Sequence, residues 1–196
     1  MHKCLFAFLM AVTLAGAVLA EPFDDATAAF DRGDYATALR LFRPLADAGD
    51  PVAQYVLGSM YGNGRGVPQD YAEAVEWYRR AADQGNAKAQ SNLGFMYSSG
   101  YGVLQDYAEA VKWYRKGADQ GDAETQRALG MMYATGQGVP GDYVEAHKWL
   151  NLAASRYPAG AEDRDKAVKM RDTVASKMTP AQIAEAQKLA REWKPK

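Results

Sequence analysis

His147 is one of the few residues in this sequence whose side chain could do catalytic or metal chemistry. The other histidine is His2, and the one cysteine is Cys4. As a general base, His147 would need a nucleophile or carboxylate converging on it, and as a metal ligand it would need carboxylates as co-ligands. No motif points to either set. Because Val75 and Val111 occupy the equivalent positions 72 and 36 residues earlier, a packed histidine in place of valine is the competing interpretation.

Residues 62–66, with the sequence GNGRG, resemble a phosphate-binding loop. Such loops follow a strand, whereas a helical pattern precedes this one. The equivalent segments 36 and 72 residues later keep the second and third glycines but place Ser98 and Ala134 where the first one stands. Turn formation explains this selection, because Gly64 and Gly66 can adopt positive φ without steric cost.

Asp70, Asp106 and Asp142 lie 36 residues apart, so they do not form a pair of catalytic carboxylates. Each directly precedes a helical pattern, where an aspartate side chain accepts hydrogen bonds from the amide groups of the first turn. Among the turn residues, Arg65 and Tyr101 are weaker binding candidates. The sequence thus predicts no catalytic residue, no metal ligand and no cofactor, and it indicates a protein that is not an enzyme.

Residues 1–20 are typical of a secretory signal peptide. They combine Lys3, an apolar run over residues 5–19 and small residues before Glu21. We expect cleavage after Ala20 and a periplasmic or secreted protein. An uncleaved membrane anchor is the alternative interpretation.

Loss of this segment narrows the possible functions. The mature chain would have 196 − 20 = 176 residues, no cysteine, one histidine and a net charge of 22 − 24 = −2. No disulfide framework, thiol nucleophile or thiolate zinc site is then available. The near-zero net charge gives no general attraction to nucleic acid or to anionic membranes. We expect a soluble monomer or weak oligomer with no nucleic-acid partner and no stable membrane insertion.

A period of 36 residues organises most of the remaining chain. Residues 51–86 and 87–122 agree at 23 of 36 positions without a gap, and a third copy, residues 123–158, fades after Ala154. The residues shared by all three copies, named here in the first, include Leu57, Gly58, Met60, Tyr61, Gly64, Gly66, Val67, Asp70, Tyr71, Ala74, Trp77 and Ala82.

Each copy holds two amphipathic helical segments joined by a glycine-containing turn. In the first segment, Ala53, Leu57, Met60 and Tyr61 follow the i, i+4, i+7, i+8 spacing of one helix face. The second segment opens at Asp70. The aromatic residues at positions 61, 77 and 78 and their equivalents share these stripes with alanine and leucine, so they are predicted to lie in the core. A single helix pair cannot enclose its apolar face, so the copies must stack and share one core. The sequence therefore predicts an all-α solenoid.

This pattern resembles the Sel-one-like repeat family, a branch of the tetratricopeptide-like solenoids. The matching segments are A-x-x-x-L-G-x-x-Y from Ala53, G-x-G-V from Gly64, D-Y-x-x-A from Asp70 and W-Y-x-x-A-A from Trp77. The match covers residues 51–154. The resemblance implies a right-handed αα superhelix of helix–turn–helix repeats, in which the first helices of successive repeats line a concave surface.

Capping segments are expected at both ends of the repeats. Residues 21–50 look like a tetratricopeptide half-repeat and are predicted to form the N-terminal cap. Residues 159–196 are predicted to form the C-terminal cap. In that cap we expect a charged helix from about Glu162 to Lys177 and a last helix from Thr179, where Gln182 is placed to complete a capping box.

One side of the first helix changes from copy to copy, and this side is the predicted partner-binding groove. On a helical wheel, the recurring residues fall on one half and the changing residues on the other. The predicted groove residues are Tyr55, Val56, Ser59, Asn92, Phe95, Arg127 and Met131. A solvated face with scattered apolar residues is the competing interpretation.

The repeats, the export signal and the lack of catalytic groups favour an exported interaction or scaffold module that binds another protein or a peptide segment in its groove. One alternative is a hydrolase of cell-wall or β-lactam substrates, an activity proposed for cysteine-rich relatives whose paired cysteines this mature chain lacks. The other alternative is a purely structural subunit of an envelope assembly, with its outer face or caps making the contact.

Overall fold

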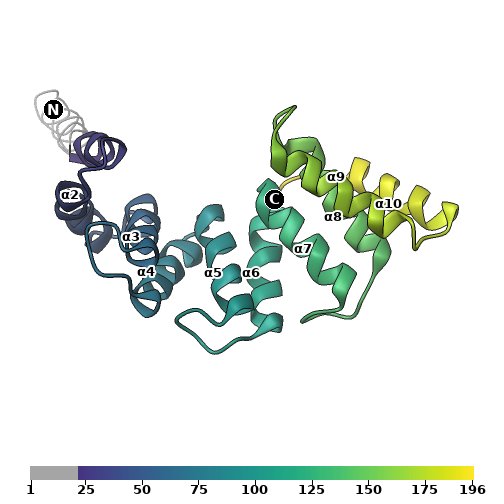
Figure 1. Ribbon diagram of the computed structural model, residues 1–196, viewed down its shortest axis with the longest axis horizontal. Coiled ribbons are helices and arrows are strands. Elements are labelled where there is room, and N and C mark those ends of the chain that lie inside the picture. Colours follow the sequence, from purple (N-terminus) through teal and green to yellow (C-terminus); the bar gives the residue numbers. More distant parts are fainter. Residues whose placement is uncertain (1–21) are drawn as a thin grey trace, which may run out of the picture. The chain divides into compact units, whose positions relative to one another are not determined.

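The computed structural model describes residues 22–196, and all regular structure in this range is helical (Figure 1). Residues 22–31 form a first helix. The helices after it are α2 (Tyr35–Asp47), α3 (Pro51–Asn63), α4 (Tyr71–Asp83), α5 (Ala87–Ser99), α6 (Tyr107–Asp119), α7 (Ala123–Thr135), α8 (Tyr143–Arg156), α9 (Glu162–Ala175) and α10 (Pro180–Glu192). The predicted signal peptide, residues 1–20, lies outside the described residues. Within residues 22–196, no helix has both the length and the apolar character of a membrane span.

Among the described residues, contacts define two compact units, residues 22–77 and 78–196, with the boundary inside α4. In the second unit α5 packs on α6, α6 on α7 and α7 on α8, so that each helix pair shares apolar surface with the next. The predicted all-α fold of consecutive helix–turn–helix repeats is confirmed.

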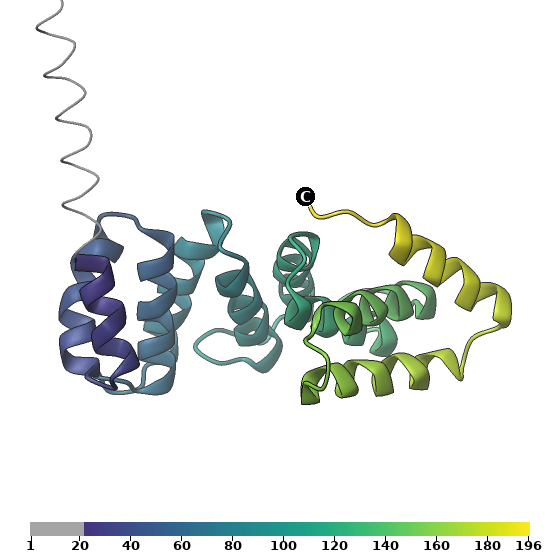
Figure 2. The same cartoon turned by 90° about the horizontal axis from the view of Figure 1, so that it is seen from above.

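The first unit has its own core. Residues 22–31, α2 and α3 lie side by side around it (Figure 2). Phe42, Leu57, Met60 and Trp77 are buried there. Burial of these large side chains supplies the apolar driving force that an isolated helix pair lacks.

Aspartate side chains cap the second helices, as the sequence predicted. The Asp70 carboxylate accepts hydrogen bonds from the backbone amides of Ala72 and Glu73 at 2.9 and 3.1 Å. Asp106 and Asp142 cap α6 and α8 in the same way. Each cap satisfies amide groups that have no partner inside the helix.

Glycines end the first helices and let the turn approach a neighbouring backbone. Gly64 is the left-handed C-cap of α3, and Gly136 has the same role in α7. The second glycine of each turn also has a left-handed conformation. At Gly66 there is no room for a side chain, because a Cβ there would lie 2.6 Å from the Tyr35 carbonyl oxygen. The turn-forming interpretation of these glycines is therefore confirmed, since all of them adopt positive φ and Gly66 also has no room for a side chain.

Two polar contacts recur with the period of the sequence. Gln54, Gln90 and Gln126 are buried, and their amide groups donate 3.1 Å hydrogen bonds to backbone carbonyls at the end of the preceding helix. A second series joins an arginine to a tyrosine hydroxyl 18 residues later, in the pairs Arg43–Tyr61, Arg79–Tyr97 and Arg115–Tyr133. Both series tie the second helix of one repeat to the first helix of the next.

The C-terminal helices cover α8. The Trp193 ring meets the Trp149 ring edge-on at a centroid distance of 6.2 Å, and the Arg156 guanidinium lies 4.4 Å from the Trp193 ring centroid. The predicted capping box is present at the start of α10, where Thr179 and Gln182 exchange hydrogen bonds. The charged helix ends at Ala175, two residues before the predicted end.

Substitutions on the packed face and on the changing face of a repeat should differ in their effect on stability. Trp113 is 7% exposed, whereas Ser91 is half-buried on the opposite side of its repeat. Trp113→Ala is expected to lower the free energy of unfolding by about 3 to 5 kcal/mol and Ser91→Ala by less than about 0.5 kcal/mol. Urea unfolding followed by circular dichroism measures both. Equal losses would contradict the assignment of the two faces.

A glycine pair separates the cost of close contact from the cost of positive φ. A Cβ on Gly138 (φ 70°) would lie 2.2 Å from the Tyr107 carbonyl oxygen, whereas one on Gly85 (φ 90°) would have no neighbour within 4 Å. Gly85→Ala is expected to cost about 1 to 2 kcal/mol from the backbone alone. Gly138→Ala should cost clearly more in thermal unfolding, and a smaller effect at Gly138 would show that its turn does not pack as described.

Candidate functional site

A pocket on α5 and α7 brings together four of the predicted groove residues, Asn92, Phe95, Arg127 and Met131. It lies entirely within the second unit and has a volume of about 510 Å³. Its complete lining is Ser91, Asn92, Phe95, Tyr114, Glu124, Arg127, Ala128, Met131 and Met132. Apolar side chains with a few polar groups on a rigid helical frame are the usual composition of a binding site.

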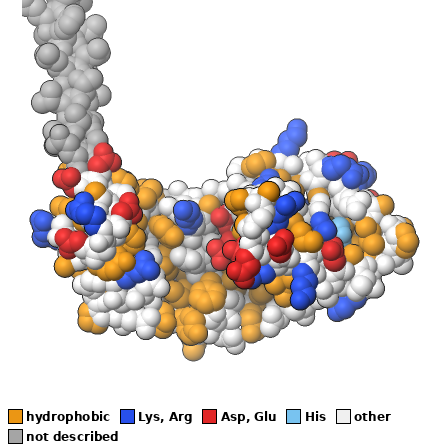
Figure 3. All heavy atoms as spheres, turned by 45° about the horizontal axis from the view of Figure 1, so that its top comes forward, with side chains coloured by type: hydrophobic (Ala, Val, Ile, Leu, Met, Phe, Trp, Pro, Cys, Tyr) orange, Lys and Arg blue, Asp and Glu red, His pale blue; other side chains and the backbone are white. Residues whose placement is uncertain are grey.

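Phe95 gives this pocket an exposed aromatic side. Its side chain is 48% exposed and packs edge-on against the Tyr101 ring, with 5.8 Å between the centroids. Tyr101, a weaker candidate from the turn, thus stands beside a predicted groove residue. The surface of the second unit mixes apolar side chains with charges of both signs (Figure 3). Exposed aromatic rings within such a surface are suited to contact with another protein.

Arg127 supplies the cationic group of the pocket. Its guanidinium lies 4.0 Å from the Glu124 carboxylate and donates a hydrogen bond to the Tyr157 hydroxyl. Its Nε atom is buried and has no hydrogen-bond partner within residues 22–196. A buried N–H without an acceptor costs free energy, so Arg127 has donor capacity that the described residues do not satisfy.

Tyr114 lines the floor of the pocket, a role that the sequence analysis missed. Because Tyr78 occupies the equivalent position one repeat earlier, the recurrence assigned this aromatic to the core alone. The ring is mostly buried beneath Gly94, burial raises the pKa of its phenol, and its hydroxyl lies 3.3 Å from the Ser98 hydroxyl. The third repeat has Leu150 at this position, which is the one sequence signal that the site is variable.

The other three predicted groove residues belong to the first unit. Val56 is partly buried and packs against the core of that unit. The Ser59 hydroxyl and carbonyl accept hydrogen bonds from the Asn63 amide at 3.2 and 2.8 Å. Tyr55 is half-buried on α3. Val56 therefore differs between repeats but packs against the core of its unit.

The two remaining candidates from the sequence have neighbours that explain them. The Arg65 guanidinium lies 5.8 and 5.4 Å from the ring centroids of Phe30 and Tyr35, a cation–π arrangement within the first unit. His147 is only 3% exposed, and its Nδ1 has no hydrogen-bond partner within residues 22–196. Burial and the nearby Arg171 guanidinium lower the pKa of His147, so its ring is neutral at pH 7. Within the same residues, no group of three or more His, Cys, Asp or Glu side chains could hold a metal ion.

The fold and this pocket define a helical repeat protein of the solenoid type. The family model of the Sel1 repeat matches residues 31–50, 51–86, 87–122 and 123–157. The chain belongs to the Sel1 repeat family. The first of these ranges falls in the segment that the sequence analysis assigned to the N-terminal cap.

Two solved structures show the same fold. One is a protective antigen of uropathogenic Escherichia coli that displays an SLR fold, with a TM-score of 0.71, 33% identity and coverage of 80% of this chain. The aligned region is 32% of the antigen's chain, so this chain spans about a third of its length. The other is a Sel1 repeat protein from Oxalobacter formigenes, with a TM-score of 0.67, 31% identity and coverage of 86% of this chain and 74% of that one. None of the curated proteins matches the chain significantly. Sel1 repeat proteins are generally protein–protein interaction scaffolds.

The lowered pKa of His147 predicts a specific pH dependence of stability. Below pH 6.5, the unfolded chain binds a proton on this ring before the folded chain does, so the free energy of unfolding falls until the lower folded-state pKa is passed. His147→Val, which restores the residue of the first two repeats, should remove this component. Urea unfolding of both proteins between about pH 8 and pH 4 gives the comparison. Parallel pH profiles would contradict the burial of a neutral imidazole.

Proposed function

We propose that the chain is exported and binds a segment of another protein in the pocket on α5 and α7. The observation that carries this proposal is the convergence of Asn92, Phe95, Arg127 and Met131, which differ from their equivalents in other repeats, on one pocket. The general role of Sel1 repeat proteins as interaction scaffolds supports it. Export is supported by the signal-like composition of residues 1–20.

The chemistry of the pocket suits a polypeptide. Phe95 and Met131 offer apolar contact, and Met131 can adapt its shape through its flexible thioether chain. Asn92 can donate and accept hydrogen bonds, and Arg127 can only donate them, so backbone carbonyls of a bound segment have suitable partners. Aromatic residues, methionine and arginine are enriched where proteins contact each other.

Site-specific crosslinking in the native compartment identifies the partner and tests the proposal. A photo-crosslinking residue at position 95 is expected to capture the partner, whereas the same residue at position 112, on the far side of α6 with a Lys112 side chain that is 70% exposed, is the control site. Crosslinks from position 112 with none from position 95 would contradict the proposal and favour a structural contact through the outer face.

The purified partner then allows a matched pair of substitutions. Phe95→Ser is expected to weaken binding by roughly tenfold, about 1.4 kcal/mol, because it removes an aromatic contact. Leu104→Ser is the control, since Leu104 is also apolar and is 91% exposed but does not line the pocket. Isothermal titration calorimetry measures both affinities. Equal affinities of the two variants would count against the pocket.

A further inference from the structure

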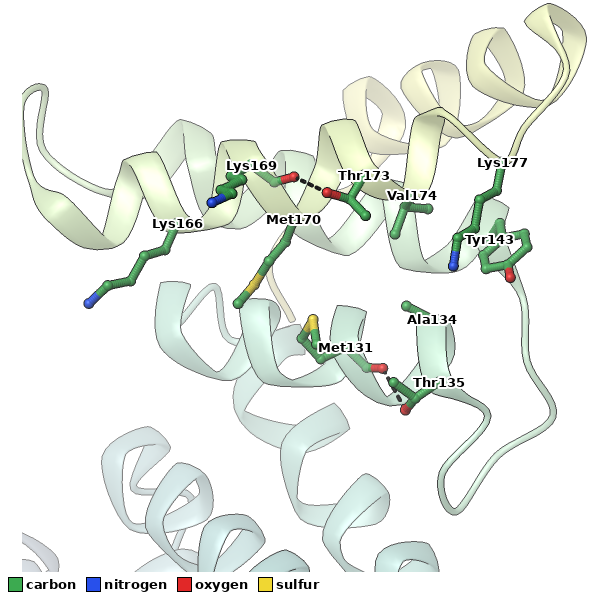
Figure 4. A pocket seen from close by; sticks show the side chains of 10 residues that line it. All are labelled: Met131, Ala134, Thr135, Tyr143, Lys166, Lys169, Met170, Thr173, Val174 and Lys177. Carbon is green, nitrogen blue, oxygen red and sulfur yellow. Dashed lines mark hydrogen bonds between the residues drawn. The ribbon is translucent and has the colours of Figure 1, made fainter.

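A second hollow lies between α7 and α9, at the start of the C-terminal cap (Figure 4). Its volume is about 440 Å³. Met131 and Ala134 approach it from α7, and Met170 and Val174 approach it from α9. These side chains give the hollow an apolar floor that can hold one or more large apolar side chains of a ligand.

The rim of this hollow is cationic. Its ten lining residues include Lys166, Lys169 and Lys177 but no acidic residue. Lys166 is paired with the carboxylates of Glu162 and Asp163, at 2.9 and 3.3 Å. Within residues 22–196, Lys169 and Lys177 have no carboxylate within 4.0 Å, although the Lys177 ammonium lies 5.5 Å from the ring centroid of Tyr143. Two positive charges beside an apolar floor therefore make no salt bridge within the part of the chain that the structure describes.

The two threonine hydroxyls of the lining are already engaged in hydrogen bonds. The Thr135 hydroxyl donates to the Met131 carbonyl at 2.9 Å, and the Thr173 hydroxyl donates to the Lys169 carbonyl at 2.8 Å (Figure 4). A ligand consequently meets apolar surface, ammonium groups and the Tyr143 side chain in this hollow. The complementary ligand has an apolar body with a negative charge next to it.

The hollow continues from the pocket of the proposed function. Met131 lines both, so the two sites share one stretch of α7. A polypeptide bound at Phe95 can reach the hollow by passing Met131, and this continuity favours a polypeptide ligand over a separate small molecule.

We infer that the hollow between α7 and α9 binds an acidic part of the same partner segment, with a large apolar side chain on the floor and separate Asp or Glu side chains paired with Lys169 and Lys177. This inference rests on the proposed function. It adds a chemical requirement to the partner, which the pocket at Phe95 does not impose.

Selection of displayed random peptides on the purified protein tests this inference. Enriched peptides are expected to contain Asp or Glu next to Leu, Phe or Met. Their binding to the unchanged protein should decline with added salt, as expected for contacts between opposite charges. Their binding to the double variant Lys169→Glu/Lys177→Glu should be weaker by roughly tenfold. Lys188→Glu/Lys194→Glu is the matched control, because it makes the same charge change at exposed positions that do not line the hollow.

The outcomes separate the inference from the proposed function. Acidic peptides that lose affinity for the first double variant and keep it for the control support the inference. Peptides that depend on Phe95 but are indifferent to Lys169 and Lys177 overturn it and leave the proposed function standing. Binding of dodecanoate in the hollow without any acidic peptide overturns it in favour of a small amphiphile. Failure to enrich any peptide contradicts both.

Discussion

The helices of each repeat can pack closely only where one of them presents no side chain to the other. A Cβ on Gly94 would lie 2.6 Å from the Tyr114 ring, and a Cβ on Gly130 would lie 2.8 Å from the Leu150 Cγ atom. Interiors packed at this density tolerate little change in volume. These contacts reserve one side of α5 and α7 for packing, and they leave the opposite side free to vary without loss of the fold. The changing residues of the pocket at Phe95 lie on that free side, while the packed residues Tyr114 and Met132 also line it.

Recurring polar contacts hold successive repeats together, and the polar groups that make them are not available to a ligand. Buried Gln90 and Gln126 satisfy backbone carbonyls, and Arg79 and Arg115 bond to tyrosine hydroxyls. Such groups are occupied in holding repeats together. Lys169 and Lys177 instead line an apolar hollow and have no carboxylate within 4.0 Å in the described residues, so these two charges are not used to hold the repeats together.

Features that recur in the sequence could be predicted from it, whereas features that occur once could not. The caps at Asp70 and its equivalents and the left-handed glycines followed from the period, because each copy repeats the same local requirement. The hollow beside Met170 could not be found in this way, since residues 159–196 have no internal copy and the hollow depends on how far α9 stands from α7. Tyr114 was assigned to the core because it recurs, although its ring also lines the pocket. Val56 varies between repeats and nevertheless packs against a core, so variability alone does not identify a binding residue.

A saturation mutagenesis scan of α5 and α7, read out both for protein abundance and for binding of the crosslinked partner, tests the central claim most directly. The account predicts that substitutions on the recurring side reduce abundance, and that substitutions on the changing side, such as those at Asn92 and Phe95, reduce binding at unchanged abundance. Loss of binding that followed abundance at every position, with no position affecting binding alone, would contradict the claim that packing and recognition occupy opposite sides of these helices.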